Sequence, residues 1–247
     1  MADENIFISL VIPAYNESQI IADTIDKALA YLSKKNYSFE IIVVDDGSID
    51  DTRDVVGNLS KKCPFLRLIC NSHLGKGASV KSGVLFSRGE YVLFSDADLS
   101  TPLEELEKML PLLVDDYDVV VGSRALTGST LLKKQGWFRR TMGKTFNVFI
   151  KLLVFNGIND TQCGFKCFKK VTAHRLFSSQ RLNGFCFDVE ILYIAKKIGY
   201  RVKEIPISWA NRCDSRVRLV RDSLSMAVDI LRIKANELRG MYKCGVN

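Results

Sequence analysis

Short apolar runs alternate with helical patterns along the first half of the chain, and this alternation constrains the fold more than any other feature. Residues 7–13 (FISLVIP) and 40–44 (EIIVV) are apolar runs of strand length, and residues 18–34 between them carry apolar side chains at helical spacing. Further strands are expected at residues 66–70, 91–95 and 118–122, with helices at residues 52–62, 77–87 and 103–113. This order is typical of an α/β fold with a mainly parallel, doubly wound sheet and helices on both faces.

The second half of the chain loses this strict alternation. Residues 185–198 predict a buried helix and residues 200–207 a strand, whereas residues 160–168 form a compact block of mixed polarity. Basic and aromatic residues mingle in residues 137–155, and an apolar stripe with charges beside it runs along residues 219–239. Both of these last segments predict amphipathic helices, which either pack on the domain or lie at a membrane surface.

No stretch of the sequence reaches the roughly 20 apolar residues that a helix needs to cross a bilayer. Residues 149–155, the longest apolar run nearby, are interrupted by Lys151, and the acidic residues 1–5 are too short for a signal peptide. The odd number of cysteines, seven, favours reduced thiols in the cytosol over a disulfide framework. With no repeat and no obvious linker, we expect a single domain over residues 1–247.

Charge is divided unevenly between the two halves of the chain. Residues 1–128 hold 12 basic and 20 acidic side chains, a net charge of −8, and residues 129–247 hold 23 basic and 8 acidic side chains, a net charge of +15. This excess predicts an anionic partner for the second half, such as nucleic acid, a membrane surface or a phosphate. Charge alone leaves these partners open, together with a simple drift of surface charge along the chain.

Polar residues follow three of the expected strands. They form the clusters Pro13–Glu17, Asp45–Ser48 and Asp96–Asp98. Because ligands of parallel sheets bind at the carboxyl ends of the strands, we expect all three clusters to meet at one edge. The first strand is not followed by G-x-G-x-x-G, and G-x-x-x-x-G-K-[ST] is absent, which disfavours dinucleotide enzymes and P-loop NTPases.

The sharpest chemical signal is Asp96-Ala97-Asp98. Two carboxylates two residues apart, after a buried strand, suit Mg²⁺ or Mn²⁺, which would bridge the phosphates of a nucleotide diphosphate. The alternative is a solvated turn. Asp45 and Asp46 can accept hydrogen bonds from a base or ribose, or they form a turn that caps the helix at Thr52.

Seven motifs together resemble a known family. VIPAYNE (11–17), VVDDGS (43–48), GKG (75–77) and DADLSTP (96–102) resemble family 2 glycosyltransferases of the GT-A fold. GSRA (122–125), DTQCGFKCF (160–168) and FDVEILYIA (187–195) resemble dolichyl-phosphate β-glucosyltransferases and their prokaryotic polyprenyl-phosphate relatives. The resemblance covers residues 6–235. It implies a nucleotide-sugar-binding half over residues 6–128 and an acceptor- and membrane-facing half over residues 129–240, with C-terminal amphipathic helices.

The resemblance also implies roles for individual residues. The implied contacts of the donor nucleotide sugar are Pro13, Ala14, Tyr15, Glu17, Asp45, Asp46, Lys76, Asp96, Ala97 and Asp98. The implied contacts of the acceptor phosphate are Arg124, Arg139, Arg140, Arg212 and Arg216. Asp96 and Asp98 would hold the metal, and the catalytic candidates are Asp98, Arg124 and Asp188. Ser100 stands where mannosyl-transferring relatives often carry Gln, so a third metal ligand is not assigned.

The implied reaction is an inverting transfer of glucose from UDP-glucose to a polyprenyl phosphate. Because a lipid phosphate is already an anion, Arg and Lys can hold it without a general base, and Asp188 is expected to orient sugar hydroxyls or a basic residue. Mannose from GDP-mannose, an N-acetylhexosamine, or a polysaccharide hydroxyl as acceptor with Asp188 as base stay open as alternatives. A binding module without catalysis would leave Asp96 and Asp98 without a purpose.

The implied location is the cytosolic face of a membrane. We expect peripheral contact with that membrane, because no segment of the sequence spans one. A membrane-embedded partner subunit stays open. With a membrane-borne phosphate as the anionic partner, nucleic acid is not expected.

Overall fold

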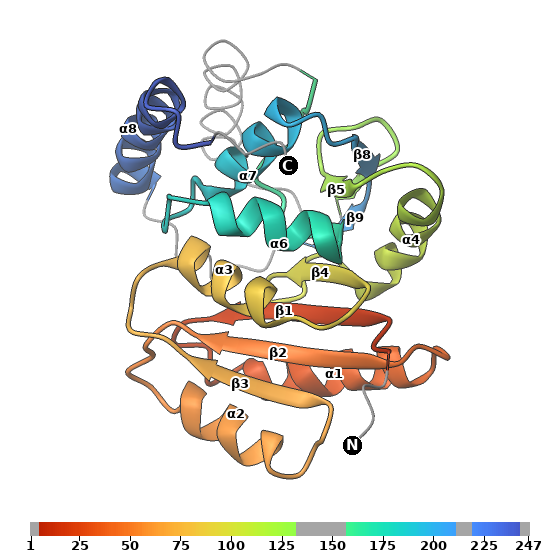
Figure 1. The fold of residues 1–247 in the computed structure, drawn as a ribbon. Helices are drawn as coiled ribbons and strands as arrows, with labels where there is room; N and C mark the ends of the chain where they lie inside the picture. Colours follow the sequence, from red (N-terminus) through yellow and green to blue (C-terminus); the bar gives the residue numbers. More distant parts are fainter. Residues whose placement is uncertain (1–4, 132–156, 211–218, 243–247) are drawn as a thin grey trace.

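A computed structural model describes residues 5–131, 157–210 and 219–242 of the chain. Its centre is a seven-stranded sheet in the order β3-β2-β1-β4-β7-β5-β8, and a small second sheet pairs β6 with β9 (Figure 1). The strands are β1 (Ile8–Ala14), β2 (Phe39–Asp45), β3 (Leu66–Cys70), β4 (Tyr91–Ser95), β5 (Val119–Ser123), β6 (Thr130–Leu131), β7 (Phe165–Lys169), β8 (Val202–Pro206) and β9 (Ser208–Trp209). β1 to β4 run parallel to one another, and β8 runs parallel to β5. The expected α/β fold with a mainly parallel sheet is confirmed.

Helices cover both faces of this sheet. They are α1 (Ile21–Ser33), α2 (Thr52–Ser60), α3 (Lys76–Phe86), the short 3-10 helix η1 (Leu103–Glu105), α4 (Leu106–Asp115), α6 (Lys170–Ser179), α7 (Phe187–Lys197) and α8 (Leu219–Leu238). Leu10 and Ile12 of β1 point to a core shared with α1, α2 and α4, while Val11 points to a core shared with α3, α6, α7 and α8. Because side chains alternate along a strand, a fully apolar strand supplies both cores at once.

The helices expected near the C-terminus are present as α7 and α8. The amphipathic helix expected over residues 137–155 lies outside the described residues. Across the described ranges, no helix is both long and apolar enough to cross a bilayer.

β7 is the main element that the sequence did not predict. It lies between β4 and β5 and runs antiparallel to both. Lys166 and Lys169 interrupt its apolar run, which is why residues 160–168 did not resemble a strand, yet Lys166 is buried. α6 and the short strands β6 and β9 were not predicted either. Because β7 runs in the opposite sense, its first residue, Phe165, pairs with Ser95 at the carboxyl end of β4. The residues just before β7 therefore reach the edge where ligands are expected.

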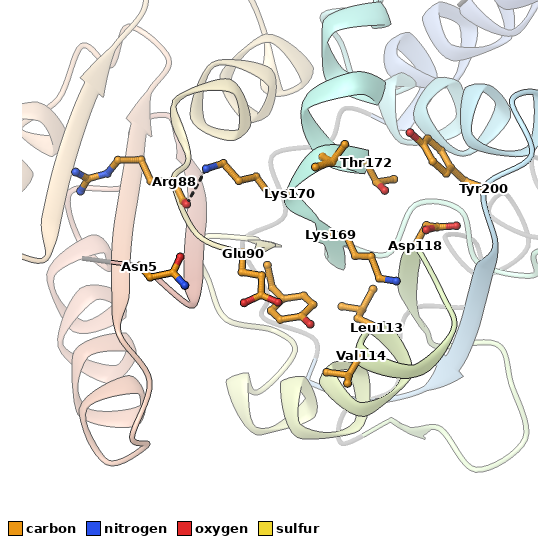
Figure 2. Close-up of a pocket in the computed structure, with 12 residues that line it drawn as sticks. Asn5, Arg88, Glu90, Leu113, Val114, Asp118, Lys169, Lys170, Thr172 and Tyr200 are labelled. Carbon is orange, nitrogen blue, oxygen red and sulfur yellow. Dashed lines mark hydrogen bonds between the residues drawn. The ribbon is translucent and has the colours of Figure 1, made fainter. Parts of the chain in front are cut away.

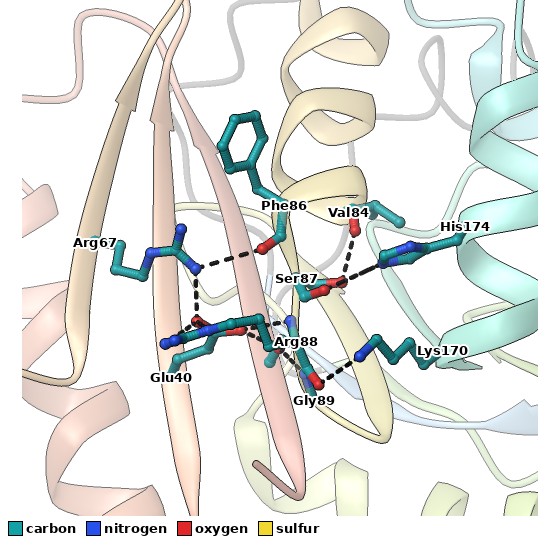
Figure 3. A network of polar contacts seen from close by, with 10 residues as sticks. Glu40, Arg67, Val84, Phe86, Ser87, Arg88, Gly89, Lys170 and His174 are labelled. Atoms are coloured by element: carbon teal, nitrogen blue, oxygen red, sulfur yellow. Dashed lines mark hydrogen bonds and ion pairs between the residues drawn. The ribbon is translucent and has the colours of Figure 1, made fainter. Parts of the chain in front are cut away.

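The buried carboxylate of Glu40 joins the strands at their amino ends. Glu40 at the start of β2 accepts hydrogen bonds from Ser9 Oγ (2.7 Å) in β1 and Arg88 N (2.7 Å) before β4. Arg67 of β3 adds an ion pair at 2.9 Å, and the guanidinium of Arg88 adds another at 3.1 Å (Figure 3). A buried carboxylate must be paired and hydrogen-bonded to be tolerated, and here its partners come from the starts of the neighbouring strands. The strands are thus tied together at their amino ends, away from the edge that carries the polar clusters.

Candidate active site

The carboxyl ends of β1, β2 and β4 meet at one edge of the sheet, as the sequence predicted. Ala14 pairs with Asp45 across β1 and β2, and its carbonyl accepts a hydrogen bond from Asp46 N at 2.8 Å. Beyond β4, Asp96 N donates to the carbonyl of Gly164 at 3.1 Å. Any side chain at position 164 would collide with the carboxylate of Asp96, so this close approach requires glycine. The block that precedes β7 is therefore seated directly against Asp96.

Asp96 and Asp98 lie half-exposed just beyond β4, next to a lysine. Lys76, the first residue of α3, places Nζ 2.6 Å from Asp96 Oδ1. Ser100 N and Ser100 Oγ donate to the two oxygens of Asp98 at 2.9 and 2.6 Å. Burial alone would lower the pKa of Lys76, but the neighbouring carboxylates, Asp96 foremost, raise it above its ordinary value. The edge therefore carries two carboxylates and one permanently charged ammonium.

This pair of carboxylates fits a hard divalent cation. Mg²⁺ is usually held by one or two carboxylates together with substrate phosphates and water. Asp96 and Asp98 supply that number, and both are partly exposed. In the part of the chain that the structure describes, no group of three or more His, Cys, Asp or Glu side chains could hold a metal on its own. The remaining ligands of an ion at this edge would come from a nucleotide and from water.

Asp46 accepts hydrogen bonds within the protein. Its buried carboxylate accepts hydrogen bonds from the loop that leads into α3. The donors are Leu74 N (3.1 Å), Gly75 N (3.0 Å) and Ser79 Oγ (3.0 Å). His73 Nδ1 also lies 2.9 Å from Asp46 Oδ2. The carboxylate of Asp46 thus holds the loop that carries Lys76, and its expected contact with a nucleoside stays a prediction.

Three other residues expected at the donor site turn inward. Asp45 is buried, and Ser48 N lies 3.3 Å from each of its carboxylate oxygens, so Asp45 forms a turn. That turn does not cap the helix at Thr52, whose N–H donates to Asp50 Oδ1 at 3.0 Å. Ala97 is buried, and its carbonyl accepts a hydrogen bond from Thr24 Oγ1 at 2.5 Å. Ala14 is part of the core. The side chains of these three residues are buried at the base of the edge, and their contact with a donor stays a prediction.

Two stacked aromatic rings stand beside these aspartates. Tyr15 stacks on His73 with ring centroids 4.1 Å apart and an angle of 18° between the planes. Pro13 and Glu17, also expected here, are half-buried on either side of Tyr15. Sequence reasoning missed His73, since no motif contains it and only its place just before GKG could have pointed to it. The pair offers a flat surface of the kind on which planar bases stack.

Arg124 lies just beyond β5 and forms a two-pronged ion pair. Its Nε and Nη2 donate to Oδ2 and Oδ1 of Asp160 at 2.7 and 2.8 Å. The guanidinium also lies over Trp209, 5.5 Å from the ring centroid. Burial alone would raise the pKa of Asp160, but Arg124 lowers it below its ordinary value. Sequence reasoning placed Arg124 at the acceptor phosphate but missed Asp160, although Asp160 begins the DTQCGFK motif.

A second, fully buried ion pair lies behind the half-exposed carboxylates. Lys166 of β7 pairs with Asp188 in the first turn of α7, and these residues are only 1% and 4% exposed. Lys166 Nζ also donates to the Cys163 carbonyl at 2.5 Å and lies 5.8 Å from the centroid of Phe94. Burial raises the pKa of Asp188, against the opposite influence of Lys166 and Lys76. This contact agrees with the prediction that Asp188 orients a basic residue.

Four predicted contacts of the acceptor phosphate fall outside the described residues. They are Arg139, Arg140, Arg212 and Arg216. Their placement at the acceptor therefore stays a prediction.

The cavity drawn in Figure 2 lies at the opposite edge of the sheet. It has a volume of about 730 Å³, and its lining includes Arg88, Glu90, Asp118 and Lys170. Lys170 Nζ donates to the carbonyl of Arg88 at 3.0 Å across it. Its charges have both signs, and its lining contains none of the predicted site residues. The candidate active site is therefore the polar edge at the carboxyl ends of the strands.

Known proteins are similar to this chain along nearly its whole length. The sequence profile of Glycosyl transferase family 2 matches residues 9–177. A dolichyl-phosphate beta-glucosyltransferase from Dictyostelium discoideum is 36% identical over 253 aligned residues, which cover 97% of this chain and 77% of the relative. The proteins of the same name from Saccharomyces cerevisiae and Homo sapiens are each 34% identical, over 98% and 96% of this chain and 78% and 77% of the relatives.

Solved structures share the fold at lower sequence identity. Mannosyl-3-phosphoglycerate synthase from Rubrobacter xylanophilus has a TM-score of 0.69 and 20% identity, over 97% of this chain and 76% of that structure. Glucosyl-3-phosphoglycerate synthase from Mycobacterium tuberculosis, solved with Mn²⁺, UDP-glucose and phosphoglyceric acid, has a TM-score of 0.63 and 18% identity, over 92% and 78%. These likenesses establish the architecture alone.

Proposed function

This chain belongs to glycosyl transferase family 2, and from that premise we propose that it transfers glucose from UDP-glucose to a polyprenyl phosphate of the dolichyl type. The proposed products are UDP and a β-linked polyprenyl phosphate glucose. The observation that carries the proposal is the similarity, across both halves of the chain, to relatives named dolichyl-phosphate beta-glucosyltransferase at 34% to 38% identity. The polar edge described above supplies the chemistry that this reaction needs.

Paired carboxylates and a lysine support a nucleotide diphosphate as donor. Asp96 and Asp98 would hold Mg²⁺ or Mn²⁺, and when bound the ion would neutralise the charge that develops on the departing diphosphate. Lys76 adds a fixed positive charge 2.6 Å from Asp96. The stacked pair of Tyr15 and His73 stands at the ends of the neighbouring strands and offers a surface for the uracil ring.

The acceptor needs positioning more than activation. A phosphate monoester is already anionic near pH 7, so no side chain has to remove a proton before it attacks. Arg124 is held by Asp160 and Trp209. The guanidinium of Arg124 has five N–H groups, and Asp160 accepts from two of its nitrogens. The other groups can hold a phosphate oxygen in line with the anomeric carbon. In-line attack on an α-linked donor inverts the configuration and gives the β-linked product.

A hydroxyl acceptor on a polysaccharide fits the site less well. Such an acceptor requires a general base within reach. Asp188, the residue considered for that role, is buried and paired with Lys166. The names of the relatives also favour glucose over mannose. We place the reaction at the cytosolic face of a membrane with peripheral contact, and a membrane-embedded subunit is not part of the proposal.

A transfer assay tests the proposal directly. The purified chain is incubated with radiolabelled UDP-glucose, Mg²⁺ or Mn²⁺ and a short-chain polyprenyl phosphate, and lipid-soluble, acid-labile radioactivity is counted. GDP-mannose and UDP-N-acetylglucosamine serve as competing donors, and Asp98→Asn serves as the inactive control. We expect product from UDP-glucose alone. Equal transfer from GDP-mannose, or transfer only to a sugar hydroxyl, would refute the proposal.

A further inference from the structure

α8 presents an apolar face that no described part of the protein covers. Met226, Ile230 and Ile233 lie on its inner side and are buried in the core under α7. The apolar stripe that the sequence placed on this helix points the other way. Val228, Leu231 and Leu238 are 49%, 62% and 88% exposed. An amphipathic helix normally buries its stripe, so this second apolar face calls for a partner.

Both carboxylates in the described part of α8 are paired with basic side chains. Two acidic residues belong to the part of α8 whose side chains are described, residues 225–238. Asp229 is buried and accepts from Arg232 Nη1 at 2.9 Å, and Glu237 is paired with Lys197 at 3.2 Å and with Lys234 at 3.1 Å. Arg232 and Arg239 are exposed beside the apolar stripe. Arg232, Lys234 and Arg239 exceed these two carboxylates by one charge, so the outward surface is apolar with a small net positive charge.

α8 is held firmly against the rest of the protein. Just beyond its end, Tyr242 is buried, and its hydroxyl donates to Glu190 of α7 at 2.5 Å. The carboxylate of Glu190 also accepts from Arg181 N and Leu182 N, which begin the loop before α7. The outward face of α8 therefore keeps a fixed direction relative to the sheet.

α8 lies on the side of the molecule to which the first strands point. In Figure 1, α8 stands at the upper left, and β1, β2 and β3 point to the left. The loop before α7 lies between the two places. A Cβ built on Gly184 would lie 3.8 Å from Asp229 Oδ2 of α8, and a Cβ built on Gly77, beside Lys76, would lie 2.9 Å from the carbonyl oxygen of Gly184. α8 and the polar edge are therefore joined through a single loop.

We propose that the outward face of α8 lies on an anionic bilayer surface. The apolar stripe enters the boundary between headgroups and acyl chains, while Arg232 and Arg239 meet anionic headgroups. This inference rests on the proposed function in one respect: the lipid phosphate acceptor would be presented at the same plane, beside the polar edge. The binding of the protein to a bilayer is a separate property that needs no donor and no catalysis.

Vesicle binding tests the inference. Wild-type protein is sedimented with vesicles of phosphatidylcholine and phosphatidylglycerol, and with vesicles of phosphatidylcholine alone, without donor or acceptor. We expect Leu231→Glu and Leu238→Glu each to lower the partition coefficient on anionic vesicles about tenfold or more, because an exposed leucine is replaced by a charge. The matched control is Val171→Glu in the first turn of α6, an apolar residue that is 77% exposed and belongs to another helix. This control should bind like wild type.

Several outcomes would overturn the inference. They are wild-type protein that ignores anionic vesicles, α8 variants that bind as well as wild type, and an equal loss in the Val171→Glu control. Self-association of the wild-type chain that Leu231→Glu abolishes, without vesicle binding, would assign the face to a second copy instead. Transfer to a water-soluble, short-chain polyprenyl phosphate should persist in Leu231→Glu. A wild-type chain that binds vesicles but transfers no glucose would refute the proposed function and support this inference.

Discussion

Replacing Asp188 with asparagine isolates the contribution of one buried ion pair. The substitution keeps the size of the side chain but removes the carboxylate that offsets the buried Lys166, which is left with neutral acceptors such as the new amide oxygen and the Cys163 carbonyl. Breaking a buried pair in this way costs about 3–5 kcal/mol, because the desolvation of the surviving charge is no longer offset. That is a large part of the roughly 5–15 kcal/mol that stabilises a typical domain.

Urea unfolding followed by circular dichroism at pH 7.5 measures this loss. With an m-value of about 3 kcal/mol/M, the midpoint should fall by about 1–2 M. The matched control is the double variant Lys166→Met with Asp188→Leu, which removes both charges. It should be more stable than Asp188→Asn, although the orphaned Cys163 carbonyl costs about 1–3 kcal/mol. A single variant within about 1 kcal/mol of wild type, or a double variant no better than the single, would contradict the reasoning.

Three further predictions concern the polar edge. Asp98→Asn should abolish transfer and leave the urea midpoint unchanged, and chelation of wild-type protein with EDTA should do the same until Mn²⁺ is restored; residual turnover would remove the metal from the mechanism. His73→Ala should weaken UDP binding in calorimetry about tenfold, as expected for one lost stacking contact, while His73→Phe should retain it; equal affinities would exclude His73 from the base site. Asp160→Asn should be less stable than wild type at pH 7, and the two should converge in acid. Arg124 lowers the pKa of Asp160 in the folded protein, so the ion pair stabilises the fold fully above the unfolded pKa of about 3.9. This stabilisation is lost as the pH falls through the pKa of folded Asp160. A constant difference in stability from pH 7 to pH 2 would disprove the pairing.

The first half of the fold could be predicted because β1, β2, β4 and β5 are buried on both faces along most of their length. Such a strand needs a continuous apolar run, like residues 41–44 of β2, and that run is visible without any partner. β7 could not be predicted in the same way, since Lys166 is tolerated there only because Asp188 lies 22 residues further along the chain. A local pattern contains no information about such a pair.

The candidate site was predictable as a place and less so as a set of contacts. The position of Asp96 and Asp98 just after a strand located them at one edge, the family resemblance added Lys76, and the structure places Lys76 against Asp96. The place of Asp46 at this edge could be inferred, but its hydrogen bonds to the loop before α3 could not, because they depend on where that loop returns. The stacking of His73 on Tyr15 could not be predicted, because it depends on where the loop after β3 returns. The composition of that loop does not encode its path.

The antiparallel strand in the middle of the sheet limits how this protein can be recombined. β4 and β5 belong to the donor half of the chain, and β7, which separates them, comes from the other half. A fragment that stops near residue 128 would leave these two strands about 10 Å apart, two strand spacings, with no backbone between them. Chimaeras that exchange the acceptor half must therefore carry a strand that fits the register of a foreign β4. New acceptor preferences on this scaffold are more readily acquired by substitutions in the segments that flank β7 than by exchange of whole halves.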